Sequence, residues 1–310
     1  MLDRFQARVW VKSLPSREHP ERNEDLAWSA ANGMAHAVID GMGGSRRIVD
    51  GREIGGEHAA AGVVAVLNER LQDLPANISV GTARELLSVV VAEAGARIYG
   101  EVNVSGQIPQ EQLPEGKTVE DVMAAAVMTA AIFCDGARRA VIGQNGDTRA
   151  YLFSDGELLL LTDDQDAVML DVLEGKLTAE EADAIQEAMD NFDGRDIGQL
   201  DPKARAYFFR RNMLFGQIGD SPEPRPPEFA TIQLRTGDML ALVSDGVYAN
   251  LSTSEIRDAL VSIDPAASLV DRADSRSGER PLPDPGDLSA LCNYRAHQDD
   301  ATAVVVQVGW

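Results

Sequence analysis

An apolar run ends in an aspartate and a glycine-rich loop in Val38-Ile39-Asp40-Gly41-Met42-Gly43-Gly44. A second apolar run ends in the same way in Leu242-Val243-Ser244-Asp245-Gly246. Short, continuous apolar runs of this kind predict buried strands. A carboxylate where such a strand ends, next to a glycine that lets backbone approach closely, is typical of a site for a hard cation. Asp299 and Asp300 stand just before the apolar run 303–308, so we expect a sheet to gather distant carboxylates into one metal site.

Hydrophobic periodicity predicts strands, then a helix pair, strands again, further helices and a last strand. The expected strands are at 5–13, 26–31, 34–39, 124–134, 138–144, 148–154, 157–162, 229–235, 238–244 and 303–308. The expected helices are at 57–73, 82–100, 253–262 and 265–273. This order lacks regular βαβ alternation, so it predicts antiparallel sheets with helix pairs packed outside them. Asp135-Gly136, Asn145-Gly146 and Asp155-Gly156 separate four of the strands and predict one antiparallel meander.

Two segments differ from this pattern. Residues 164–212 are charged, helix-prone and short of β-branched residues, and Thr178 with Glu181 predicts a capped helix N-terminus there. Residues 274–298 are polar and contain three prolines, which predicts a surface excursion before the last strand. Because no repeat or linker divides the chain, we expect one domain over residues 1–310 with these two insertions.

The composition limits the classes of function. The 310 residues are 44% apolar and carry a formal net charge of −22, which argues against binding nucleic acid or an anionic membrane through bulk charge. The two cysteines, Cys134 and Cys292, form no CxxC motif, so neither a disulfide framework nor a thiolate zinc site is expected. No signal peptide or membrane-spanning run is recognised, and we expect a cytoplasmic protein.

The candidate chemistry lies in acidic residues. They are Glu24, Asp25, Asp40, Asp147, Asp245 and Asp299. A set of oxygen ligands without clustered His or Cys favours Mg²⁺ or Mn²⁺ over zinc. There is no GxSxG motif, and the four histidines show no spacing that indicates a triad. Two alternatives stay open, because Asp147 follows a turn dipeptide and Glu24 with Asp25 could be a solvated pair.

Several short motifs follow one another in a fixed order. They are Asn23-Glu24-Asp25, Asp40-Gly41-Met42-Gly43-Gly44, Gly55-Gly56-Glu57-His58-Ala59-Ala60, Gly146-Asp147-Thr148-Arg149, Arg211-Asn212-Met213-Leu214, Ser244-Asp245-Gly246-Val247 and Asp299-Asp300-Ala301-Thr302. With these motifs, the chain resembles the metal-dependent serine/threonine protein phosphatases of the type 2C or PPM family, in their bacterial form. The resemblance implies an α+β fold, a four-layer αββα sandwich in which helix pairs flank two central antiparallel sheets. Residues 164–212 occupy the place of the family's flap, a helical segment that tunes substrate access.

The resemblance also implies a binuclear Mg²⁺ or Mn²⁺ centre. Asp40 looks like the carboxylate that bridges both ions, and Asp245 and Asp299 look like ligands of the first ion. The Gly41 carbonyl would bind the second ion, with Glu24 acting mainly through water.

The motif positions imply two further roles. Asp147 matches the aspartate that shares a third, weaker ion with Asp245, and Asp25 looks like a partner that supports the ligands from behind. Asp40 and Asp245 would then act through metal-activated water, a bridging hydroxide that hydrolyses phosphoserine or phosphothreonine on proteins. The implied partners are a phosphorylated protein and a cognate serine/threonine kinase.

Two positions depart from the family's pattern. Pro20 stands where the family often has an arginine that grips the substrate phosphate, and Met42 stands where some members have a histidine. A guanidinium fork suits phosphate, so we expect another arginine to make that contact. The candidates are Arg46, Arg47 and Arg52 of the loop after Gly44, and Arg22. An exposed basic loop without this role is the alternative.

The sequence leaves two alternative functions open. The missing arginine would also fit a weakly active or inactive phosphatase-like regulatory module that binds a phosphoprotein. The same metal chemistry would serve a phosphatase of small molecules. The presence of every carboxylate that the family pattern requires favours the active protein phosphatase.

Overall fold

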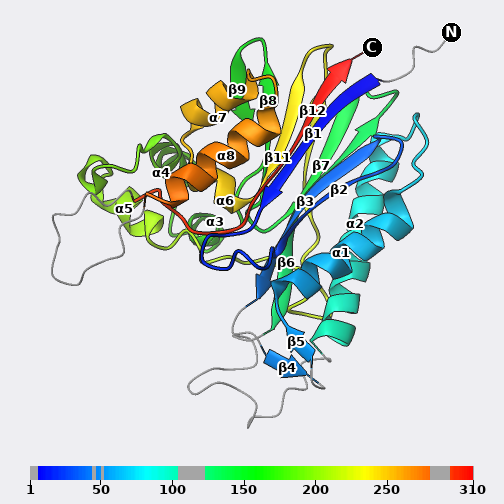
Figure 1. Ribbon diagram of the computed structural model, residues 1–310, viewed down its shortest axis with the longest axis horizontal. Helices are drawn as coiled ribbons and strands as arrows, with labels where there is room; N and C mark the ends of the chain where they lie inside the picture. The colour runs from blue at the N-terminus through cyan, green and yellow to red at the C-terminus, as the bar shows by residue number, and fades with distance from the viewer. Residues whose placement is uncertain (1–5, 44–46, 50–51, 104–122, 280–293, 310) are drawn as a thin grey trace.

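Apolar, alternating segments form two five-stranded antiparallel sheets that pack face to face in the computed structural model (Figure 1). The structure describes residues 6–43, 47–49, 52–103, 123–279 and 294–309. The first sheet, in the order β1-β12-β11-β8-β9, consists of Gln6–Leu14, Ala301–Gly309, Met239–Val243, Arg149–Ser154 and Glu157–Leu160. The second sheet, in the order β10-β7-β6-β3-β2, consists of Glu228–Gln233, Arg139–Asn145, Ala124–Cys134, Ala35–Gly43 and Asp25–Ser29.

The strands of the first sheet show how alternation builds two cores. Leu240 and Leu242 of β11 face the second sheet, together with Val304 and Val306 of β12. The residues between them, Ala241 and Val305, face the opposite side and pack under helices. Because successive side chains on a strand point to opposite faces, a run that is apolar at every position must be covered on both sides.

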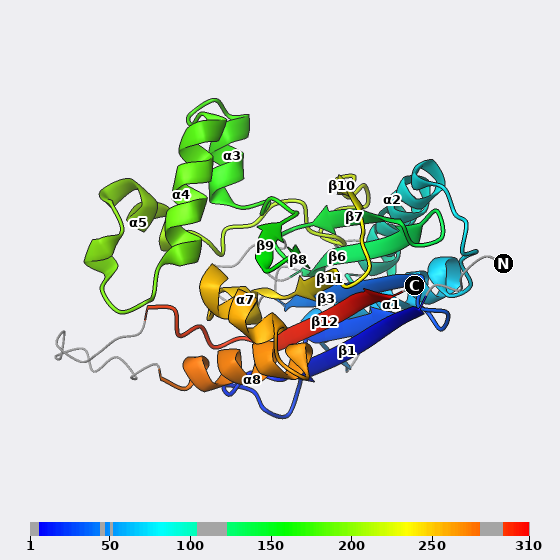
Figure 2. The same ribbon diagram turned by 90° about the horizontal axis from the view of Figure 1, so that it is seen from above.

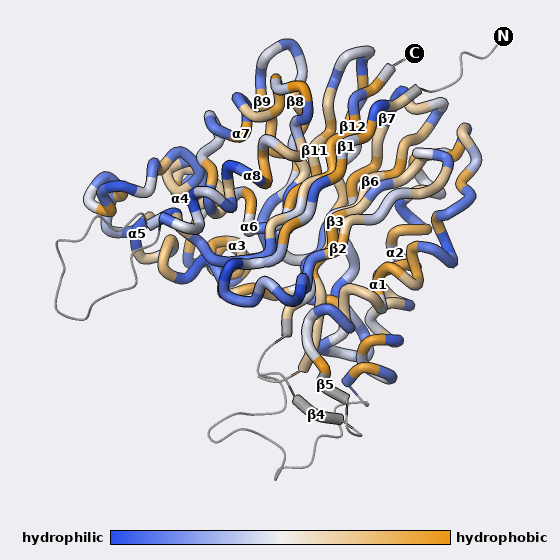
Figure 3. Tube along the Cα trace, in the orientation of Figure 1, coloured by the Kyte–Doolittle hydropathy of each residue, from blue (hydrophilic) through white to orange (hydrophobic). Residues whose placement is uncertain are grey.

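Helix pairs supply the outer layers. Helices α1 (Gly56–Leu71) and α2 (Val80–Arg97) pack on the second sheet, and α7 (Thr253–Leu260) and α8 (Pro265–Ser277) cover the first. Seen from above, the sheets lie between these pairs (Figure 2). Hydropathy colouring places the most apolar stretches in the central strands and on parts of α1 and α2 (Figure 3). The predicted four-layer αββα sandwich is therefore confirmed.

The segment predicted as a flap folds into helices around a small core of its own. Helices α3 (Ala167–Leu173), α4 (Ala179–Asn191) and α5 (Pro202–Phe208) enclose buried side chains such as Phe192 and Phe208. The predicted cap is present, since the Thr178 hydroxyl accepts from the Glu181 amide at 3.2 Å and the Glu181 carboxylate accepts from the Thr178 amide at 2.9 Å. This segment projects beside the sandwich, near the short helix α6 (Asp245–Tyr248) (Figure 1).

The meander prediction was wrong at one turn. Asp135-Gly136 and Asp155-Gly156 adopt positive φ angles and close hairpins, as expected. At Asn145-Gly146 the chain instead leaves the second sheet and enters the first, because β7 and β8 belong to different sheets. Asp147 therefore lies on a crossover between the sheets, the kind of place where side chains of both can meet.

Two regions beside the predicted site residues also differ from expectation. Strand β3 continues past Asp40 to Gly43, and a small hairpin of β4 (Arg47–Val49) and β5 (Arg52–Ile54) follows it. Within 274–298, helix α8 extends to Ser277 and Arg295 is 3% exposed, so those parts are not a surface excursion. Residues 280–293 lie outside the described residues. Among the helices that the structure describes, none is long and apolar enough to cross a membrane.

Candidate metal centre

Two of the predicted carboxylates face each other on neighbouring strands. The register of β2 and β3 pairs Asp25 with Asp40. Asp25 is buried, and its Oδ2 accepts a hydrogen bond of 2.6 Å from the hydroxyl of Ser244, which follows β11 of the other sheet. The Ser244 hydroxyl accepts in turn from the Thr302 amide at 2.9 Å, so Asp25 is fixed between the two sheets.

Two neighbouring inner strands of the first sheet, β11 and β12, contribute a second pair of carboxylates at their ends. Asp245 begins α6 directly after β11, and Asp299 lies just before β12, which pairs with β11. Gly246 allows this close approach, because a Cβ atom there would lie 2.0 Å from the Asp300 carbonyl oxygen. The glycine after Asp245 is thus required by packing between α6 and the segment that carries Asp299.

Asp299 and Asp300 are neighbours with different tasks. The Asp300 carboxylate accepts hydrogen bonds of 2.6 Å from the backbone amides of Ser16 and Glu24. It is 2% exposed and holds the N-terminal segment in place. The Asp299 side chain is 41% exposed, so it is the member of the pair that is open to a ligand.

Glu24 and Gly41 meet through their backbones. The Gly41 amide donates to the Glu24 carbonyl at 3.1 Å. A Cβ atom on Gly41 would lie 2.3 Å from the Gly56 carbonyl oxygen, at the start of α1, so only glycine fits. The Glu24 side chain lies beside a cation, with its Oε1 3.4 Å from Nε of Arg22.

Asp147 joins the group from the crossover between the sheets. It is 4% exposed, and its Oδ2 accepts a hydrogen bond of 2.7 Å from the Tyr248 hydroxyl at the end of α6. Its Oδ1 is buried without a hydrogen-bond partner among the described residues, as is Oδ1 of Asp245. Two buried carboxylate oxygens without a proton donor are costly unless a cation meets them.

The carboxylates act on one another electrostatically. Burial raises the pKa of Asp40 well above its usual value, and the charges of four other aspartates raise it further. These four are Asp25, Asp245, Asp299 and Asp147. The structure therefore brings together the five aspartates predicted for the site, at the ends of strands from both sheets.

Sequence reasoning missed His297. Its Nε2 lies 3.4 Å from Oδ2 of Asp245 and 3.2 Å from Oδ2 of Asp299. Burial alone would lower the pKa of His297, but hydrogen bonds and charges of these two aspartates raise it to about 10. The imidazolium is thus a counter-ion to the cluster, and together with the charge of Arg211 it holds the pKa of Asp245 below its usual range despite burial. In the sequence, the feature that could have pointed to His297 is its position two residues before Asp299.

The donor set fits small divalent cations. Aspartate oxygens dominate it, and Mg²⁺ and Mn²⁺ prefer carboxylate, carbonyl and water oxygens. A carboxylate oxygen of Asp245 and one of Asp299 lie within 4.8 Å of each other and of a ring nitrogen of His297, which could itself ligate only after losing its proton. Binding of a cation would neutralise the repulsion that raises the pKa of Asp40 and would satisfy the buried oxygens of Asp147 and Asp245.

The candidate phosphate-binding arginines are only partly described. Arg46 lies outside the described residues, and Arg47 and Arg52 are described only by the paired backbone of β4 and β5. Arg22 lies next to the Glu24 carboxylate. Arg17, by contrast, is engaged by Asp274 on α8 and donates to both of its carboxylate oxygens, at 2.8 and 2.7 Å.

Comparison with known proteins assigns a family. Residues 20–282 match the family model described as protein phosphatase 2C. Protein phosphatase PhpP of Streptococcus pneumoniae is 32% identical over 129 residues, 42% of this chain and 43% of PhpP. Serine/threonine protein phosphatase PstP of Mycobacterium tuberculosis is 28% identical over 238 residues, 77% of this chain and 36% of PstP. The chain thus spans less than half the length of these relatives.

Solved structures share the fold over the whole chain. The M. tuberculosis phosphatase PstP/Ppp superposes with a TM-score of 0.65 at 23% identity, covering 98% of this chain and 99% of that one. The catalytic domain of PstP in complex with two manganese ions superposes with a TM-score of 0.61 at 22% identity, covering 99% and 100%. Because the family model matches most of its length, this chain belongs to the protein phosphatase 2C family.

Proposed function

We propose that this protein hydrolyses phosphoserine and phosphothreonine esters on proteins, with Mg²⁺ or Mn²⁺ held by its acidic cluster. The observation that carries the proposal is the convergence of five aspartates from both sheets, two of which, Asp147 and Asp245, have a buried oxygen with no hydrogen-bond partner among the described residues. The names of the relatives, both protein phosphatases, support this class of substrate. The manganese ions bound to the PstP domain support the choice of metal.

We assign the ligands by position. Asp40 would help to hold both ions, Asp245 and Asp299 would hold the first, and the Gly41 carbonyl would hold the second, with Glu24 acting mainly through water. When bound, such ions would supply an activated water as the nucleophile and positive charge for the phosphoryl oxygens.

The remaining residues act by position and charge. Asp147 would share a third, weaker ion with Asp245 through its Oδ1, which has no partner in the part of the chain that the structure describes. Asp25, fixed by the Ser244 hydroxyl, keeps the strand that carries Asp40 in register and adds negative charge behind it. A serine/threonine kinase is the class of enzyme that would install the phosphate.

The test is phosphate release from a phosphothreonine peptide by the metal-stripped protein, with and without added Mn²⁺. We expect Mn²⁺-dependent turnover that Asp245→Asn abolishes and that Asp73→Asn, an exposed change after α1, leaves intact. Binding of the peptide without turnover would support the regulatory module instead. Turnover of metabolite phosphates in preference to the peptide would support a small-molecule phosphatase.

Arg22 is the described arginine that we propose for the substrate phosphate. Its side chain is 34% exposed and lies against Glu24, at the edge of the cluster. We expect Arg22→Ala to raise KM for the phosphopeptide more than it lowers kcat, because the lost contact is made by the bound substrate as well as by the transition state. Arg17→Ala is the matched control, since Arg17 is held by Asp274. An unchanged KM in Arg22→Ala would contradict this assignment.

A further inference from the structure

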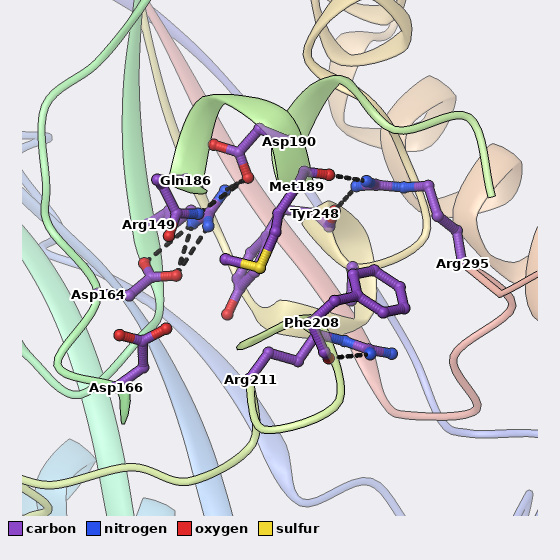
Figure 4. A pocket seen from close by; sticks show the side chains of 11 residues that line it. Arg149, Asp164, Asp166, Gln186, Met189, Asp190, Phe208, Arg211, Tyr248 and Arg295 are labelled. Carbon is purple, nitrogen blue, oxygen red and sulfur yellow. Dashed lines mark hydrogen bonds and ion pairs between the residues drawn. The ribbon is translucent and has the colours of Figure 1, made fainter. Parts of the chain in front are cut away.

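A buried arginine links the flap to the candidate metal centre. Arg149 begins β8, two residues after Asp147, and its side chain is 3% exposed. Its guanidinium donates to Asp164 from Nε at 2.9 Å and from Nη2 at 2.7 Å, and its Nη1 donates to Asp190 of α4 at 3.0 Å. Figure 4 shows Arg149 between these two carboxylates. The flap helix α4 is thus tied by a buried charge to the strand next to Asp147.

The same guanidinium covers an aromatic ring that reaches the centre. The Arg149 guanidinium carbon lies 3.8 Å from the centre of the Tyr248 ring. The hydroxyl of that ring donates to Oδ2 of Asp147. This hydrogen bond occupies one oxygen of Asp147 and leaves Oδ1 as the buried oxygen with no partner among the described residues. The orientation of the Asp147 carboxylate is therefore set by Tyr248.

A second buried arginine ties the backbone of Tyr248 to the same helix. Arg295 donates from Nη1 to the Met189 carbonyl at 2.8 Å and to the Phe192 carbonyl at 3.2 Å, at the end of α4. From Nη2 it donates to the carbonyls of Tyr248 and Leu251 at 2.5 Å. Both the ring and the backbone of Tyr248 thus depend on groups that also hold α4.

The position of Asp190 in α4 indicates that the ion pair between Asp190 and Arg149 does not serve to stabilise the helix itself. Asp190 lies in the last turn of α4, where a carboxylate opposes the helix dipole. Its hydrogen bond to Arg149 is what compensates for that placement. A cavity of about 30 Å³ lies among these side chains, so α4 meets the sandwich through polar contacts around a space large enough for a water.

We propose that Arg149 and Tyr248 are positioning residues that make the orientation of Asp147 depend on the docking of the flap helix α4. The inference rests on the proposed role of Asp147 as a cation ligand. Docked, α4 holds Arg149 and Arg295, these hold Tyr248, and Tyr248 presents Oδ1 of Asp147 to the ion. By thermodynamic reciprocity, a cation at Asp147 favours the docked flap to the same extent.

The test is a Mn²⁺ titration of the metal-stripped full chain, in which the electron paramagnetic resonance signal of free Mn²⁺ counts the sites and their affinities. Asp147→Asn identifies the class of sites that involves Asp147. We expect Tyr248→Phe and Asp190→Ala to lower the Mn²⁺ affinity of the sites that involve Asp147 by about tenfold or more, as for loss of a hydrogen bond to a charged group. The affinity of the tighter sites should not change. Asp183→Ala, an exposed change on the same helix, is the control and should match the wild type.

Hydrogen exchange gives a second readout of the coupling. Mn²⁺ should slow amide exchange in α4 of the wild type, and this effect should disappear in Tyr248→Phe. Wild-type affinities in Asp190→Ala or in Tyr248→Phe would overturn the coupling, as would equal weakening of both classes, which indicates a general loss of structure. Unchanged binding in Asp147→Asn would overturn the assignment of Asp147 itself, and the inference with it.

Discussion

Neutralising Asp40 should make the metal-free protein more stable while it removes activity. The register of β2 and β3 places Asp25 directly opposite Asp40. Side chains in such pairs have Cβ atoms about 5 Å apart, and two unit charges at about 5 Å repel by about 3 kcal/mol at an effective dielectric constant of about 20. Partial protonation relieves some of this repulsion, so we expect Asp40→Asn to raise the free energy of unfolding by about 1–3 kcal/mol.

The sign of the pH dependence follows from the direction of the pKa shift. The pKa of Asp40 is raised above its usual value of 3.8, mainly by burial and then by the neighbouring aspartates. Between the usual value and the raised one, the folded state holds a proton that the unfolded state has lost, so stability falls as the pH rises through this window. The gain from Asp40→Asn should therefore be largest at neutral pH and should vanish below about pH 4.

The assay is thermal or urea unfolding in EDTA and in Mn²⁺. At roughly 2 °C per kcal/mol, the melting temperature of Asp40→Asn should lie about 2–6 °C above that of the wild type in EDTA at pH 7.5. Saturating Mn²⁺ should reverse the order, since an ion at about 1,000 times its Kd adds about 4.1 kcal/mol to the wild type alone. Asp73→Asn is the control. A metal-free Asp40→Asn less stable than the wild type, or one still stabilised by Mn²⁺, would refute the reasoning.

Two further substitutions test the packing around the centre. Arg149→Met should lower the free energy of unfolding, measured with urea, by about 3–5 kcal/mol, because it leaves buried carboxylates unpaired. The double variant that also carries Asp164→Asn should recover part of this loss. A cost below about 1 kcal/mol would contradict the buried ion pair. Gly246→Ala should lower Mn²⁺-dependent kcat/KM by about 100-fold, because its Cβ would meet the Asp300 carbonyl at 2.0 Å and displace Asp245. Gly81→Ala on α2, where a Cβ atom would make only an ordinary contact of 3.8 Å with the Ser79 hydroxyl, should have no effect. Equal activities of the two variants would reject this account.

The fold could be predicted from the sequence because its signals are local. Asp135-Gly136 and Asp155-Gly156 have the φ angles that hairpin turns need, and the apolar runs beside them become central strands. The same turn chemistry at Asn145-Gly146 gave a wrong prediction, because it joins two sheets rather than two neighbouring strands. Which sheet a strand enters is decided by the surface that it covers, and that surface is formed by residues far away in the sequence.

Only the site residues that belong to recognisable sequence motifs could be predicted. The acidic residues follow strand ends, so their convergence was visible in the sequence. The distinct task of Asp300 was not, because its partners, the amides of Ser16 and Glu24, lie almost the whole chain away. The contacts of His297 with Asp245 and of Tyr248 with Asp147 could not be predicted either, since they depend on how β11, α6 and the last strand pack together.

The placement of positive charge explains how so acidic a chain could still bind a phosphorylated substrate. The chain carries a net charge of −22, yet Arg149 and Arg295 are buried in contacts that hold the flap. His297 is engaged by two aspartates of the centre. These cations stabilise the fold and leave the general field negative. If the proposed function holds, we therefore expect a phosphate to be attracted by bound metal ions and by arginines near Glu24, such as Arg22. Recognition would then be short-ranged and selective for phosphate groups that can reach the strand ends, rather than for positively or negatively charged proteins in general.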